Sequence, residues 1–342
     1  GLNTGWGNHT GGNNTYIGSG AGTGAENNAN SYNTAIGRSA MLAVTTGGPN
    51  VVVGALAGDA ITIGTYNVAI GYNALTTETI GDKTTAVGDH CLYSQLSNSN
   101  NEDTGNTGVG QSAGYYNVTG TNNTYIGKAA GAGASGQSHS NNTAVGYNAL
   151  LSITTGGTNS AFGVLAGDAL LTGADNVFIG SQCGSATTDV DKATIVGHNA
   201  GAANLTSDAD GTVLVGNNAG AALTSGIGNT GVGYQALKVE DDGDYNTAVG
   251  YQALTAQTGT TGAVGNTAIG YQSGVAITKG KFNVAIGTQA LATEDVGDRS
   301  VAIGRQALYS QNSDSDNEIA GNVGVGEEAG YYNVTGQNNT YL

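Results

Sequence analysis

The 342-residue sequence has one proline, two cysteines and only nine Lys and Arg against twenty-five Asp and Glu. A net charge of −16 argues against a nucleic-acid partner, because neutralising phosphates requires clustered cations. No run of 18 apolar residues is present, so we expect no membrane-spanning segment. The chain opens Gly-Leu-Asn with no Met and no basic-then-apolar signal. We therefore expect a processed chain, or a fragment truncated at both ends.

Glycine is the abundant residue, with 60 copies, but no Gly-X-Y period runs through the chain, which excludes collagen. Hydrophobic residues make up 38% of the sequence and charged residues 10%. This composition is too apolar and too weakly charged for a disordered chain. The glycines are therefore expected to belong to another ordered repeat.

That repeat reads Asn-Thr-Ala-Ile-Gly-x-x-Ala, and its glycine serves as an anchor in each copy. Most anchors are 17 residues apart, and the longer intervals add polar residues such as 97–104. The anchors are Gly7, Gly18, Gly37, Gly54, Gly71, Gly88, Gly110, Gly127, Gly146, Gly163, Gly180, Gly197, Gly216, Gly233, Gly250, Gly270, Gly287, Gly304 and Gly326. Residues 1–342 are thus predicted to form one continuous repeat domain, with super-repeats at roughly 33–141, 142–245 and 246–342.

The positions around the anchor are strongly restricted in residue type. Asn usually stands four places before it, an apolar residue directly before it, and a small residue, mostly Ala, three places after it. Three coils give the pattern: Asn67, Ile70, Gly71 and Ala74; Asn246, Val249, Gly250 and Ala253; Asn283, Ile286, Gly287 and Ala290. Stacked asparagines are expected to form an amide ladder along the repeat.

Thr, Val or Ser three places before the anchor and an apolar residue directly before it lie on one face of an extended segment. We predict that this face is the core. The residue two places before the anchor is often Ala or Gly, as at Ala35, Gly108, Ala248 and Gly324. We expect it to face outward, where small residues would suit packing against another chain.

These patterns predict an all-β solenoid of about nineteen stacked coils, with two short strands in each coil. Frequent glycines and β-branched residues make a helical repeat unfavourable. One coil cannot bury its own apolar face, so the coils must stack on one another.

Two known families resemble this repeat. Residues 284–287 and 301–304 resemble the head repeats of YadA-like trimeric autotransporter adhesins, and residues 142–150 and 246–254 resemble the Asn-Thr-Ala-Val-Gly-Tyr-Gln-Ala-Leu repeats of viral and phage tail fibres. The resemblance implies a left-handed parallel β-roll that assembles as a homotrimer and takes part in attachment to a surface. The 17-residue coil is longer than the adhesin coil.

Several motifs have a simpler explanation as repeat positions. Residues 110–114 spell a nucleophile elbow and 131–136 a dinucleotide fingerprint, but neither has the expected strand–helix surroundings. Cys91 and Cys183 both occupy the small-residue position, which predicts inert buried thiols. We therefore expect no catalytic residue, no cofactor and no enzyme activity.

The acidic loops and the tyrosines leave alternatives open. Asp208, Asp210, Asp241, Asp242 and Asp244 are weak candidate calcium ligands, because solvated acidic loops explain them better and their spacing matches neither the EF-hand loop nor the Gly-Gly-x-Gly-x-Asp calcium roll. Tyrosines that follow the anchors, such as Tyr72 and Tyr251, either stack on sugar rings or brace the solenoid by stacking on each other.

Three functions fit this sequence. The first is a structural and adhesive fibre shaft, extracellular or in a virion tail fibre, that spaces a receptor-binding tip and associates with itself as a homotrimer or end to end. The second is a bacterial surface adhesin that binds a cell-surface glycan or receptor directly. The third is an ice-binding solenoid, for which a regular file of threonines such as Thr34, Thr85 and Thr143 would have to face outward.

Overall fold

The computed structural model describes residues 1–100, 102–258 and 262–342, and it divides into two compact units, Gly1–Thr172 and Gly173–Leu342. Both units are parallel β-solenoids, and together they contain about nineteen coils. Over the described ranges the one helical element is a 3-10 turn at Ser207–Ala209, and no helix there is long and apolar enough to cross a membrane. The predicted all-β solenoid class is confirmed.

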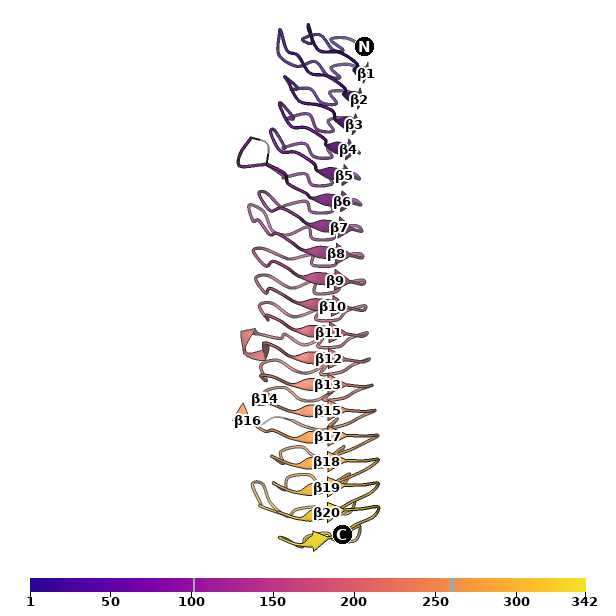
Figure 1. The fold of residues 1–342 in the computed structure, drawn as a ribbon, viewed down its shortest axis with the longest axis vertical. Helices are drawn as coiled ribbons and strands as arrows, with labels where there is room; N and C mark the ends of the chain where they lie inside the picture. The colour runs from indigo at the N-terminus through magenta and orange to yellow at the C-terminus, as the bar shows by residue number, and fades with distance from the viewer. Residues whose placement is uncertain (101, 259–261) are drawn as a thin grey trace. The chain divides into compact units, whose positions relative to one another are not determined.

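Unit 1 is a single file of three-residue strands, each paired in parallel with the next (Figure 1). The pairing keeps equivalent residues level, as Val51 with Val68 and Val68 with Thr85. The strands are β1 (Thr15–Ile17), β2 (Thr34–Ile36), β3 (Val51–Val53), β4 (Val68–Ile70), β5 (Thr85–Val87), β6 (Thr107–Val109), β7 (Thr124–Ile126), β8 (Thr143–Val145) and β9 (Ser160–Phe162).

Unit 2 repeats this arrangement. Its stacked strands are β10 (Val177–Ile179), β11 (Thr194–Val196), β12 (Val213–Val215), β13 (Thr230–Val232), β15 (Thr247–Val249), β17 (Thr267–Ile269), β18 (Val284–Ile286), β19 (Val301–Ile303), β20 (Val323–Val325) and β21 (Thr340–Tyr341). A separate two-stranded pair, β14 (Gly243–Asp244) and β16 (Gly262–Ala263), lies in the loops.

The anchor glycine ends each strand because no other residue fits there. Gly71 has φ = 140° and Gly250 has φ = 144°, a range that residues with a Cβ rarely adopt. A Cβ on Gly71 would lie 2.3 Å from the carbonyl oxygen of Gly88, and one on Gly250 would lie 2.2 Å from that of Gly270. Consecutive anchors therefore touch, and this contact allows the chain to turn sharply at the same place in every coil.

The first anchor is Gly1, and the prediction of Gly7 is wrong. Backbone hydrogen bonds join Gly5 to Ala21 and Gly7 to Thr23, which places Gly7 level with Gly24 and Gly1 level with Gly18. The spacing from Gly1 to Gly18 is then the ordinary 17-residue coil. Gly7 lies in the turns that follow the first anchor, which is why it stands only 11 residues before Gly18.

The prediction of two strands in every coil is also wrong. After each anchor the described chain forms a run of turns, in which the second and fourth residues have positive φ, as in Asn73 and Leu75 (both 53°). These residues still bond to neighbouring coils: the N–H of Asn73 donates to the Ala55 carbonyl and that of Leu75 to the Cys91 carbonyl. Left-handed residues at every second position prevent a regular strand.

The faces of the strands are the reverse of the prediction. The middle residue of the strand, two places before the anchor, is buried, and Ala35, Ala248 and Gly108 all point inward. The first and last strand residues are partly or largely exposed; Ile126, for example, is 41% exposed. Alternation along a strand shows which residues share a face but not which face is inside. The bulkier residues were wrongly assigned to the core.

The core is narrow, and its two main positions exchange volume. Where the middle strand residue is the large Tyr125, the fourth residue after the anchor is Gly131, whose Cβ would lie 2.2 Å from the tyrosine ring. Where the middle residue is the small Ala248, the same position holds the buried Leu254. In these two coils one large and one small residue fill the interior together, whereas Ala268 and Gly274 are both small and the buried Ile277 fills the space beside them.

Candidate functional site

The outward side of each strand file, here called the sheet face, is the most distinctive surface of the protein. It consists of the first and last strand residues, which are Thr, Val or Ser and Ile, Val or Phe, and neither position carries a charge in any described strand. Exposed fractions are 43% for Val51, 42% for Phe162 and 42% for Ile179. Ile, Val or Phe ends every three-residue strand, so these residues form an exposed apolar row of a kind that monomeric soluble proteins rarely leave uncovered.

The asparagines behind the sheet face hold the strands at a fixed spacing. Asn67 donates from Nδ2 to the Gly81 carbonyl (2.8 Å) and accepts at Oδ1 from the backbone N–H of Thr84 in the next coil (2.9 Å). Asn283 bonds in the same way to Gly297 and Ser300, each at 2.8 Å. The expected ladder is present, but it runs mainly between the amide and the backbone, with additional amide–amide bonds such as that from Asn50 to Asn33 (3.2 Å).

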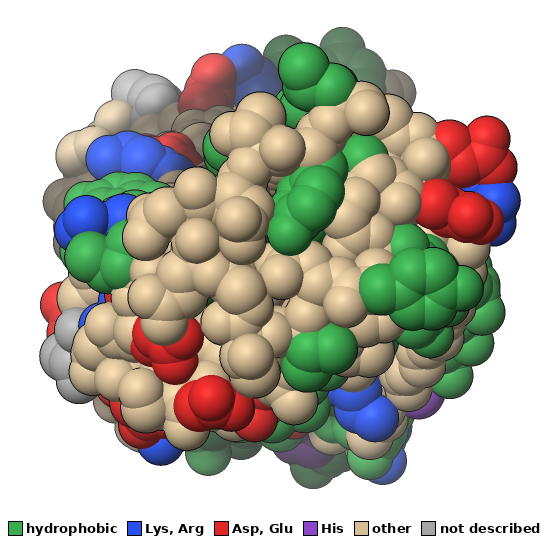
Figure 2. All heavy atoms as spheres, turned by 90° about the horizontal axis from the view of Figure 1, so that it is seen from below, with side chains coloured by type: hydrophobic (Ala, Val, Ile, Leu, Met, Phe, Trp, Pro, Cys, Tyr) green, Lys and Arg blue, Asp and Glu red, His purple; other side chains and the backbone are tan. Residues whose placement is uncertain are grey.

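The larger loops lie on the side of each unit away from the strands, here called the loop side (Figure 1). The described residues 97–100 and 102–104 and the segments 206–211 and 311–320 extend there, while the stacked strands before β21 keep the same three-residue length. Viewed from its end, unit 2 shows mostly uncharged atoms, with the acidic side chains gathered in separate clusters near the rim (Figure 2). Variation in length is thus confined to one side of the solenoid.

The candidate calcium ligands lie in two separate loops. Asp208 is in the 3-10 turn, and the Oδ1 atom of Asp210 accepts from the backbone N–H of Asp191 (2.7 Å). Asp241 and Asp242 come together with Glu240, while Asp244 accepts from the backbone N–H of Ile227 (2.9 Å). Asp210 and Asp244 therefore link neighbouring coils through their Oδ1 atoms, and the candidates that the structure brings close together are Asp241 and Asp242, with Glu240.

Three buried glutamates escaped the sequence analysis. Glu78, Glu240 and Glu294 stand at the same position of their coils, seven residues after an anchor, where some coils have Val, Ile or Leu and others have Gln, Asn or Thr. Glu78 and Glu294 each accept backbone N–H groups and a serine hydroxyl from the next coil, Ser97 and Ser313. The sequence feature that could have indicated their common position is the Glu-x-x-Gly-Asp motif, which all three share.

Glu240 differs from the other two glutamates. It accepts from the backbone N–H of Gly243 (2.8 Å) and from the Asn246 side chain (3.2 Å). Burial, together with the nearby charge of Asp241, raises its pKa to about 7, although the backbone hydrogen bonds act in the opposite direction. This carboxyl group therefore takes up a proton near neutral pH.

The motifs that suggested chemistry are repeat positions in the structure. Ser112 occupies the left-handed position after an anchor that Gln252 fills in unit 2, and Gly131 makes room for a core tyrosine. Cys91 and Cys183 are free and buried, as predicted, and burial raises the pKa of each thiol to about 12.

The tyrosines that follow the anchors stack on each other. In unit 2 the ring of Tyr251 lies 5.0 Å from Tyr234 and 5.4 Å from Tyr271, with interplanar angles of 17° and 15°. Both faces of Tyr251 are covered, so they are closed to a sugar ring. Beside this column Gln252 donates to Gln235 (2.9 Å) and Gln272 to Gln252 (3.0 Å). These rows favour bracing of the solenoid.

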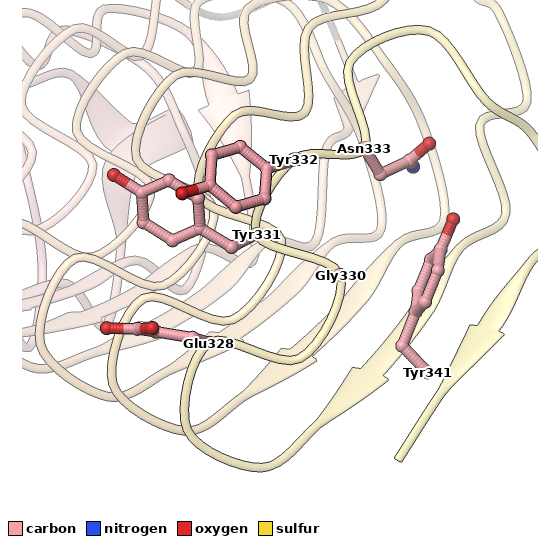
Figure 3. Close-up of a pocket in the computed structure, with 6 residues that line it drawn as sticks. All are labelled: Glu328, Gly330, Tyr331, Tyr332, Asn333 and Tyr341. Carbon is pink, nitrogen blue, oxygen red and sulfur yellow. The ribbon is translucent and has the colours of Figure 1, made fainter.

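An open pocket in unit 2 is lined by residues that have equivalents in other coils of the repeat (Figure 3). Tyr331 and Tyr332 lie on one side of it in a T-shaped pair, and Tyr341 lies on the other. In unit 1 the equivalent of Tyr341 is Tyr125, which is buried and makes a 2.6 Å hydrogen bond to His139 of the following coil. The pocket is therefore no specialised cavity.

Among the described residues, His139 is the only buried histidine. Its side chain is 2% exposed, and burial lowers its pKa to about 4. In the preceding super-repeat Asn30 takes the same place, because the hydroxyl of Tyr16 donates to the Oδ1 atom of Asn30. A neutral side chain at this position supports a core tyrosine.

No protein-family model matches the chain, and no curated protein matches it. The structure thus defines a class, the parallel β-solenoids with tandem repeats, and function has to be inferred from the surfaces described above.

Proposed function

We propose that this chain is the shaft of an extracellular or virion fibre, in which stacked coils hold a receptor-binding tip away from its anchor. Two observations support a structural role. Each apparent active-site motif is a repeat position that packing explains, and duplicated super-repeats lengthen a solenoid without adding a site. On this proposal the chain is not an enzyme.

The shaft is proposed to be a homotrimer whose chains associate through the sheet face. The observation that carries this is the contrast between the two sides of each unit: the sheet face is uncharged and has Ile, Val or Phe at the end of every three-residue strand, while the described parts of the large insertions extend from the loop side. Leaving a row of Ile and Val in water has a free-energy cost of about 25 cal/mol for each Å². Contact with a second copy removes this cost.

Light scattering on the purified chain tests the trimer. The chain mass is 33.7 kDa, so three copies give 3 × 33.7, or about 101 kDa. A mass of one chain at micromolar concentration would overturn the trimer but leave the solenoid intact.

A surface adhesin that binds a glycan or receptor directly is the second candidate. It is favoured by the protruding described residues of two loops, 97–100 with 102–104 and 311–320, whose acidic residues contribute little to the core. Replacing both loops by the shortest natural connection, that of a 17-residue coil, would abolish cell or glycan-array binding by an adhesin. A shaft would keep its mass and stability after the same change.

The ice-binding candidate gains one supporting observation, since Thr34, Thr85 and Thr143 face outward and not into the core. However, the parallel row of last strand residues contains only Ile, Val and Phe in the described strands, and Val replaces Thr in several coils. Thermal hysteresis of the purified protein decides this point. A measurable freezing-point depression would favour ice binding over the shaft.

A further inference from the structure

Two rows of exposed residues border the sheet face, one on each side. The residue five places before each anchor forms the leading edge, and the residue directly after each anchor forms the trailing edge. The leading edge has positive φ even where the side chain is bulky, as for Tyr66 (58°), Tyr245 (62°) and Phe282 (58°). Holding a bulky residue in this conformation has a free-energy cost of about 1–3 kcal/mol.

The aromatic residues of the leading edge are not covered within the chain. Tyr66, Tyr245 and Phe282 are 62%, 56% and 48% exposed. The rings of Tyr245 and Phe282 contact a glycine of the preceding coil, Gly228 and Gly265, where an added Cβ would lie only 3.2 Å and 3.1 Å from the ring. One side of each ring is thus supported and the other is open to solvent, so a strained conformation presents an aromatic surface outward.

In two of these three coils the trailing edge also has a tyrosine, whereas the coil of Phe282 has Thr288 there. The coil of Gly71 has Tyr66 on one edge and Tyr72 on the other, and the coil of Gly250 has Tyr245 and Tyr251. The next coil after Gly71 has a cation at its leading edge and an anion at its trailing edge, Lys83 and Asp89.

The coil of Gly304 has an arginine on both edges, Arg299 on the leading edge and Arg305 on the trailing edge. The guanidinium of Arg305 is paired within the chain with Glu327 and Glu328 of the next coil. This coil is therefore not counted among the matched pairs.

In a closed ring of three parallel chains, rotation relates the copies without shifting them along the axis. The leading edge of one chain then meets the trailing edge of the next chain at the same coil. We propose that these level-matched pairs fix the alignment between the chains of the trimer: in a second copy, Tyr66 docks on Tyr72, Lys83 on Asp89, and Tyr245 on the exposed ring edge of Tyr251. This inference rests on the proposed sheet-face trimer.

The existing contacts of Lys83 are compatible with this arrangement. Its ammonium group bonds to Asp103 at 2.5 Å, and both side chains are more than half exposed. An ammonium group has three donors, so the bond to Asp103 leaves donors for a carboxylate of a second copy.

Cross-linking between two different variants tests the pairs. Tyr66→Cys and Tyr72→Cys are made in separate chains that lack Cys91 and Cys183 (both changed to Ala), carry tags of different size, and are co-expressed. A short bis-maleimide should join the two tagged chains covalently, because the edges meet only between copies. The matched control combines Tyr66→Cys with Tyr147→Cys, which also lies on the trailing edge but in a coil four anchors further along.

The outcomes separate this inference from the trimer itself. Joining of Tyr66→Cys to Tyr72→Cys at several times the yield of the control supports the level-matched pairs. A mass near three chains with no excess of cross-linking over the control overturns the pairs and leaves the trimer standing. A one-chain mass overturns both. Charge exchange adds a second readout: Lys83→Asp alone should lower the trimer fraction, and Lys83→Asp combined with Asp89→Lys should restore it.

Discussion

At the scale of single residues, the anchor glycine is the position that tolerates least. In Gly71→Ala the new methyl group would lie 2.3 Å from the Gly88 carbonyl oxygen, at a φ of 140°. The backbone conformation alone has a cost of about 1–3 kcal/mol, and the clash adds to it. We expect a clear fall in the denaturation midpoint. Gly12→Ala is the control, since a Cβ there meets nothing within 4 Å, and an equal loss in both variants would contradict this explanation.

His139 makes unit 1 sensitive to acid. Its pKa is about 4 in the folded chain and 6.5 in the unfolded chain, so between these values only the unfolded chain binds the proton. Stability is therefore complete above pH 6.5 and is lost as the pH falls toward 4, by about 1.4 kcal/mol per pH unit. Denaturation of His139→Asn, which copies Asn30, should lack this loss between pH 6.5 and 4. An unchanged pH profile would contradict it.

Glu240 gives unit 2 the opposite dependence. Its pKa rises from 4.5 to about 7 on folding, so between these values the folded chain holds a proton that the unfolded chain has released. Its contribution to stability is present below pH 4.5 and is lost as the pH rises through 7, by an amount on the order of 3 kcal/mol. Glu240→Gln should flatten the denaturation profile of the chain in this range. A Glu294→Gln variant is the comparison.

At the scale of the strand and its coil, the sequence predicts the spacing well and the orientation poorly. Anchor spacing predicts where each strand ends, because a residue such as Gly250 has the same steric requirement in every coil. Orientation depends on which residues meet across the interior. A sequence feature that indicates the buried face is the pairing of a large residue with a small one, Tyr125 with Gly131 and Leu254 with Ala248. This pairing can be interpreted only if the chain after the anchor is known to fold back against the strand.

Which residues are exposed was also hard to predict from the sequence, because exposure depends on which residues meet across the interior. The row of Ile and Val was recognised as apolar, but its exposure follows only from the narrow interior. The burial of Glu78 and Glu294 was not predicted, because it depends on backbone N–H groups and serines that are brought together by stacking. Loop positions such as Asp244 were judged by charge, whereas the fold uses that carboxylate to accept from the backbone of Ile227.

Neighbouring residues of β18 provide a direct test of the two faces. Ala285 is 1% exposed, so Ala285→Asp would bury a charge without a partner and should lower stability by several kcal/mol. Ile286→Asp places the same charge on the sheet face, where water reaches it, and should leave the stability of the isolated chain nearly unchanged while lowering the trimer fraction. Denaturation and light scattering on both variants measure the two effects. The opposite ranking in stability would restore the original assignment of the faces.

At the scale of the whole molecule, the two sides of the solenoid have different chemistry. The net charge of −16 arises from positions outside the sheet face, because the outward strand residues are uncharged in the described strands. Three associated chains would carry −48, from 3 × −16. Association therefore brings apolar surfaces together while forcing acidic side chains closer to each other.

The balance between these two effects predicts how the trimer responds to salt. Raising NaCl from about 0.05 M to 0.5 M shortens the Debye length from above 10 Å to below it, which screens the repulsion between acidic chains and leaves the uncharged sheet face unaffected. We expect the trimer to dissociate at lower protein concentration in high salt, as measured by light scattering on a dilution series. With only nine Lys and Arg in each chain, level-matched ion pairs are too few to reverse this trend. Weaker association at high salt would mean that ion pairs, and not the Ile and Val rows, hold the chains together.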